Sequence, residues 1–122
     1  MSIESHRDLI VWQKTVELVT DCYRLTSGFP ADERFGLTQQ LRRAAVCVPA
    51  NIAEGKGRGG ANEFIRFINI ANGSLTEVDT HIVIAESPGF ISHSQAESIV
   101  ERVQEVGRML TGLRKSLERN AR

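Results

Sequence analysis

The stretch VPANIAEGKGRGG, residues 48–60, decides how this chain folds because an apolar helical run ends there in glycine and positive charge. Pro49 removes a backbone donor and costs roughly 3 kcal/mol inside a helix. Asn51 and Glu54 are three residues apart, so they share one helix face just before Gly55. We therefore expect a helix that is bent near its middle and a short turn that leads into another helix.

Outward from this stretch, apolar spacing predicts four helices. Their expected ranges are 8–26, 32–56 with a start at either Asp32 or Leu37, 62–86 and 94–119. The last range carries one apolar row with alternating steps of three and four residues: Ala96, Ile99, Val103, Val106, Leu110, Leu113 and Leu117. Turn residues follow the first helix at Ser-Gly-Phe-Pro and the third at Ser-Pro-Gly. No stretch alternates with period two over a useful length, so no strand is expected. Four long helices with short connections predict one all-α domain over residues 1–122, an antiparallel up-down-up-down four-helix bundle.

Composition limits the classes of protein that fit. The chain has 122 residues and is 41% hydrophobic, which is enough for one core. Fifteen basic residues cancel fifteen acidic ones, which excludes a binder that is basic over its whole surface. Cys22 and Cys47 lie in apolar runs, which predicts buried thiols rather than a disulfide or a metal site. No apolar run approaches the ~20 residues of a membrane span, and no signal peptide is visible, so we expect a cytoplasmic protein.

The first helix carries two apolar seams instead of one. One seam is Leu9, Trp12, Val16, Val19 and Tyr23, and the other is Val11, Thr15, Leu18, Cys22 and Leu25. Together they cover an arc of roughly 200°, about twice the usual core-facing stripe. Either this is a very hydrophobic core helix with some exposed side chains, or one seam forms a subunit interface. We favour the interface, and we assign it to Val11, Leu18, Cys22 and Leu25, with the other seam in the bundle core.

Several motifs together carry a family resemblance. They are Asp8-Leu9 with Trp12-Gln13-Lys14, Phe29-Pro30, Glu33 to Leu37, Gln40 to Ala45, Pro49 to Gly55 with Arg58, Phe64 to Phe67, and Gly73-Ser74-Leu75 with Glu77. With these motifs the chain resembles the bacterial 23S rRNA intervening-sequence (S23-like) proteins. The resemblance implies a left-handed four-helix bundle and a ring of five subunits, and it does not imply an enzyme. The chain is also distantly similar to the accessory variability determinants of diversity-generating retroelements, strongly basic proteins that imply a nucleic-acid partner.

Five polar residues are candidates for an internal cluster. They are Arg42, Arg43, Asn51, Glu54 and Glu77. A buried glutamate needs a cationic partner, or it takes up a proton instead. We therefore predict a charge-paired network that fixes the helix register or the subunit contact. A general acid–base pair is the alternative, but no nucleophile or orienting histidine accompanies these residues.

One end of the predicted bundle collects positive charge. In an up-down bundle both termini and the second turn share that end, which holds Arg7, Lys56, Arg58, Arg114, Lys115, Arg119 and Arg122. These cations predict a contact for an anion or for nucleic acid; the alternative is ordinary pairing of cations with helix C-terminal dipoles. Residues 55–60 match GxGxxG, but they follow a helix, which excludes a dinucleotide fingerprint.

The remaining motifs predict neither a metal site nor a cofactor. Glu77 and His81 share a helix face, but the repeated Glu-x-x-His pattern of di-iron bundles is missing. The sequence thus predicts a non-enzymatic module that binds copies of itself, most simply as a ring of five, with no catalytic residue and no membrane contact. The alternative is an accessory protein that binds nucleic acid, or another protein, weakly through the basic end. A metal or small-molecule enzyme is a remote third possibility.

Overall fold

The structure is a computed structural model and describes residues 5–120. Its long helices are α1 (Ile10–Thr26), α2 (Leu37–Gly57), α3 (Ala61–Glu86) and α4 (His93–Asn120), and its short 3-10 helices are η1 (His6–Asp8) and η2 (Ala31–Glu33). No strand occurs among the residues that the structure describes. Helix α2 begins at Leu37, the later of the two starts that the sequence allows. The carboxylate of Glu33 accepts a hydrogen bond from the Leu37 backbone N–H (3.0 Å) and so caps α2 at that point.

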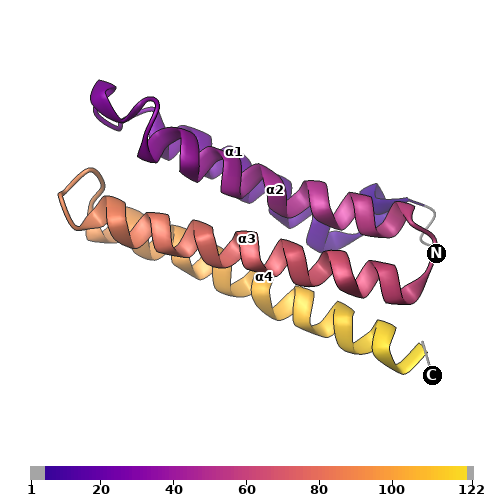
Figure 1. The fold of residues 1–122 in the computed structure, drawn as a ribbon. Helices are drawn as coiled ribbons and strands as arrows, with labels where there is room; N and C mark the ends of the chain where they lie inside the picture. The colour runs from indigo at the N-terminus through magenta and orange to yellow at the C-terminus, as the bar shows by residue number, and fades with distance from the viewer. Residues whose placement is uncertain (1–4, 121–122) are drawn as a thin grey trace.

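The four long helices form one bundle. Figure 1 shows the α2–α3 turn at the same end as both termini, and the α1–α2 and α3–α4 connections at the opposite end. Each helix packs against the next, and α4 also packs against α1. The predicted all-α four-helix bundle is confirmed. Its left-handed twist stays a prediction.

One hydrophobic core runs along the inside of the bundle. Each of the four long helices contributes fully buried aliphatic side chains, among them Leu18, Leu41, Ile52, Ile68, Ile82 and Leu110. Burial of one such side chain stabilises the fold by about 1.5–3 kcal/mol. The apolar row expected on α4 faces the core, because Ala96, Ile99, Val103 and Val106 are all buried.

Helices α2 and α3 approach each other closely at Gly55. A Cβ atom at Gly55 would lie 2.7 Å from Cβ of Phe67 and 3.1 Å from Cδ1 of Phe64. Pro49 lies inside α2, as expected. The stretch at 48–60 therefore places its one fully enclosed glycine against two aromatic residues and leaves the later glycines in the turn.

The assignment of Val11, Leu18, Cys22 and Leu25 to a subunit interface is wrong. Val11, Leu18 and Cys22, expected at a subunit interface, are buried in the core of the bundle, and Leu25 packs half-buried against it. Of the seam expected in the core, Trp12 and Val19 pack half-buried against it, whereas Val16 and Tyr23 are 39% and 42% exposed. Helical periodicity shows that α1 has two apolar stripes, but only the positions of the other helices determine which stripe faces inward.

Candidate interaction surfaces

The second seam of α1, in which Val16 and Tyr23 are exposed and the other residues are half-buried, continues onto α2. It consists of Trp12, Val16, Val19 and Tyr23 on α1 and Arg42, Val46, Pro49 and Ala53 on α2, and we call this set the α1–α2 face. Both rows step by four, three and four residues, the spacing of a helix-packing seam. The Arg42 guanidinium lies 4.6 Å from the centre of the Tyr23 ring, which joins the two rows. Val46 is 41% exposed, so the apolar surface extends across both helices.

Arg42 is held in place within the α1–α2 face. Its Nε donates a hydrogen bond to the Thr26 hydroxyl (2.7 Å), and its Nη2 donates a longer one to the Tyr23 carbonyl (3.4 Å). Within residues 5–120 it has no carboxylate partner. Neutral groups thus orient the guanidinium, and some of its N–H donors remain free to bind an anionic group.

A second surface feature is a hollow of about 570 Å³ between α2 and α3. Its lining consists of Gln40, Arg43, Ala44, Cys47, Ser74, Thr76, Glu77, Thr80 and His81. Arg43 and Glu77 come from opposite helices and face the same hollow, yet no ion pair joins them. The buried Nδ1 of His81 has no hydrogen-bond partner among the described residues. This α2–α3 hollow therefore combines two exposed charges that are not paired with each other and one buried nitrogen without a hydrogen bond.

The prediction of an internal polar cluster is wrong. Arg43, Glu54 and Glu77 are exposed, and Glu54 pairs with Arg58 (3.5 Å) instead of Arg43. Asn51 uses its amide to donate to the Cys47 carbonyl within α2 (2.8 Å). Small and aliphatic residues fill the inner face of α2, so the polar positions lie on its outer side.

The basic end is smaller than the sequence predicts. Arg58 pairs with Glu54, and Arg114 pairs with Glu118 (3.5 Å) and contacts Asn69 (3.3 Å). In the part of the chain that is described, Arg7, Lys56, Lys115 and Arg119 have no carboxylate partner. Arg122 lies outside the described residues. Carboxylates thus neutralise part of the positive charge.

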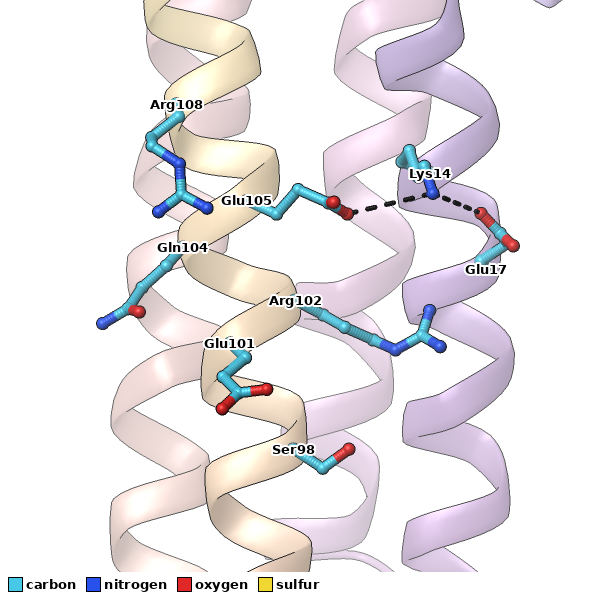
Figure 2. A pocket seen from close by; sticks show the side chains of 8 residues that line it. All are labelled: Lys14, Glu17, Ser98, Glu101, Arg102, Gln104, Glu105 and Arg108. Carbon is cyan, nitrogen blue, oxygen red and sulfur yellow. Dashed lines mark ion pairs between the residues drawn. The ribbon is translucent and has the colours of Figure 1, made fainter.

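Sequence reasoning missed a hollow between α1 and α4, shown in Figure 2. It has a volume of about 580 Å³ and is lined by Lys14, Glu17, Ser98, Glu101, Arg102, Gln104, Glu105 and Arg108. Lys14 lies 3.9 Å from Glu17 on its own helix and 4.0 Å from Glu105 on α4. Nearby, Arg102 lies 3.1 Å from Asp21 without hydrogen-bond geometry. Side chains of both charges line this α1–α4 hollow, so it lacks the uniformly basic lining that suits a phosphate. Lys14 and Asp21 are polar residues beside the inward seam of α1, and their position was the one sequence signal that could have indicated this hollow.

Neither the cysteines nor the side chains that could bind a metal ion form a reactive or metal-binding group among the described residues. Cys22 and Cys47 are free thiols, the first buried and the second partly exposed. Burial, with a smaller contribution from the charge of Asp21, raises the pKa of the Cys22 thiol to about 12, which makes it unreactive near neutral pH. Over residues 5–120, no three His, Cys, Asp or Glu side chains are grouped to hold a metal ion. No described helix is apolar over enough of its length to cross a membrane.

Comparisons with known proteins agree with the resemblance in the sequence. The chain is similar to a crystal structure of a protein of unknown function from the S23 ribosomal protein family of Bacteroides thetaiotaomicron VPI-5482. The TM-score is 0.80 at 23% identity, over 87% of this chain and 99% of that one, which shows a shared fold. No curated protein matches the chain. A family model matches residues 7–112, and the chain therefore belongs to the family described as 23S rRNA-intervening sequence protein.

Proposed function

We propose that this protein is a non-enzymatic interaction module that assembles with copies of itself through the α1–α2 face. The observation that carries the proposal is the second, outward seam of α1, continued by Val46 on α2. A row of apolar side chains at helix-packing spacing is costly to leave in water, at about 25 cal/mol per Å². A cyclic ring covers such a face in every copy with one repeated contact. The family resemblance implies five subunits.

Size exclusion coupled to light scattering tests this proposal. The wild-type protein at micromolar concentration is expected to have a multiple of the 13.5 kDa chain mass. Val16→Glu should reduce the mass with helical circular dichroism unchanged, because it places a charge in the contact. Val83→Glu is the matched control, since Val83 is 60% exposed on α3, away from the α1–α2 face, and should assemble like wild type. A monomeric wild-type protein, or normal assembly of Val16→Glu, overturns the proposal.

Nucleic-acid association is the second candidate function. It is favoured by the unpaired cations Lys56, Lys115 and Arg119 at the end where the termini and the α2–α3 turn meet. Such binding is expected to be weak, independent of sequence and strongly salt-dependent. Reversal of these three charges should abolish binding of a fluorescent RNA or DNA duplex, whereas reversal of the paired Arg114 should reduce it less. Binding that persists after the triple reversal contradicts this candidate.

A further inference from the structure

We infer that the α1–α2 face of one copy receives the outer side of α3 from the next copy, and that Arg42 pairs with Glu77 across this contact. The inference rests on the proposed self-assembly and names the surface that completes it. A head-to-tail contact needs two different surfaces on each copy. The α1–α2 face supplies only one of them.

The second surface is a stripe on α3. Ile70, Glu77 and Ile84 recur at intervals of seven residues and therefore lie on one side of the helix, and we call them the α3 stripe. Ile70 is 41% exposed and Ile84 is 48% exposed. Glu77 lines the α2–α3 hollow, which places the stripe on the side of α3 that adjoins α2. These isoleucines are therefore left uncovered by the bundle of their own chain.

The spacing of the two surfaces matches. A helix whose outward residues recur every seven positions packs against partners whose side chains step by three and four residues, because its side chains fit between theirs. Both rows of the α1–α2 face have that step. On α2 the row includes the small or compact residues Pro49 and Ala53, which allow another helix to approach closely. The α1–α2 face can therefore accept α3 as a third helix laid along two others.

The charges of the two surfaces also match. Arg42 is the only charged residue of the α1–α2 face, and Glu77 is the only one of the α3 stripe. Among the described residues, neither has an oppositely charged partner in its own chain. A charge buried alone at an apolar contact is strongly destabilising, whereas a guanidinium and a carboxylate can satisfy each other. Pairing of Arg42 with Glu77 would thus offset the free-energy cost of burying either charge at the contact.

The heights of the residues along the bundle agree with this pairing. Glu77 shares the α2–α3 hollow with Arg43, so it lies at the level of Arg42 on α2. Rotation about an axis parallel to the bundle carries one copy onto the next without changing any height. Glu77 of the next copy therefore arrives at the level of Arg42. Ile70 lies about 10 Å nearer the termini and arrives at the level of Val16.

Charge exchange tests the pairing. Arg42→Glu and Glu77→Arg should each lower the assembled mass toward that of the monomer, and the double variant Arg42→Glu/Glu77→Arg should restore it. The control is Arg24→Glu/Glu101→Arg, two exposed residues outside both surfaces, which should leave the mass unchanged. Normal assembly of both single variants, or failure of a folded double variant to recover, overturns the inference. A monomeric wild-type protein instead overturns the proposed function.

A mixing experiment covers the case in which Arg42→Glu does not fold. Val16→Glu has a damaged α1–α2 face but an intact α3 stripe, and Glu77→Arg has the reverse. Each variant alone should be monomeric, and an equimolar mixture should form a heterodimer and stop there, because only one good contact remains. A mixture that stays monomeric, or a Glu77→Arg protein that assembles alone, shows that the α3 stripe is not the surface that the α1–α2 face receives.

Discussion

Leu18 and Val16 are two residues apart on α1 and have opposite surroundings. Leu18 has no exposed surface, whereas Val16 is 39% exposed on the α1–α2 face. Substitution by glutamate introduces the same charge at either site. Its effect on folding and on assembly therefore distinguishes Leu18, which stabilises the bundle, from Val16, which is proposed to join two bundles.

We predict that Leu18→Glu unfolds the protein or lowers its stability by several kcal/mol, because the carboxylate would be buried without a partner. Urea denaturation followed by circular dichroism measures the change, and Val16→Glu serves as the comparison that keeps its helices. A Leu18→Glu protein with the wild-type urea midpoint would contradict the position of Leu18 in the core.

We predict that Gly55→Ala destabilises the bundle by about 1–3 kcal/mol, because the new methyl group would press against Cβ of Phe67. Gly112→Ala is the control: it lies inside α4 with no atom within 4 Å of the added carbon, and it should be neutral or stabilising by up to about 1 kcal/mol. Thermal unfolding of both variants checks the contrast. Equal melting temperatures would argue against close approach of α2 and α3.

At the scale of helices, the sequence predicts what depends on periodicity and misses what depends on neighbours. The α4 row from Ala96 to Leu110 is buried as expected, because a helix with a single apolar stripe has only that stripe to turn toward the core. Helix α1 has two stripes, so spacing alone could not select the inward one. Glu54 and Glu77 were expected inside because they interrupt apolar runs, but other residues of α2 and α3 fill the core and both glutamates are exposed. The α1–α4 hollow escaped prediction because it is built from charges on helices distant in sequence.

The connection between α3 and α4 carries a contact that depends on pH. His93 lies 3.0 Å from Glu86 through Nδ1 and 3.4 Å from Glu97 through Nε2. The hydrogen bond to Glu86, and then the charges of Glu86 and Glu97, raise the pKa of His93 above its ordinary value of 6.5. Because the folded state holds the proton more tightly, the stabilisation is complete below 6.5 and is lost as the pH rises through the folded value.

We predict that the melting temperature falls slightly more between about pH 6 and pH 8 in the wild-type protein than in His93→Gln, which cannot titrate. The effect is small because His93 is exposed to solvent. Differential scanning fluorimetry in matched buffers measures it, and NMR titration of the His93 ring gives the pKa directly. Identical pH dependence in the two proteins would contradict the role of this contact.

At the scale of the whole molecule, the two proposed surfaces lie on either side of α2. We predict that the melting temperature of the wild-type protein rises with protein concentration, because assembly stabilises the folded state by mass action. Val16→Glu should melt at the same temperature over the whole range. The comparison needs a dilution series across at least two orders of magnitude in concentration. A wild-type melting temperature that does not change with dilution would contradict assembly in this range.

The α1–α4 hollow lies outside both of these surfaces, so assembly would leave it open in every subunit. A ring would then display the same mixed-charge site once per copy around its rim. A partner with two matching segments joined by a suitable linker would bind the second site at an effective concentration on the order of millimolar. Its avidity could exceed the affinity of a single hollow by about 10²–10⁴. A site too weak to hold a partner on one bundle could hold it firmly on the assembled form.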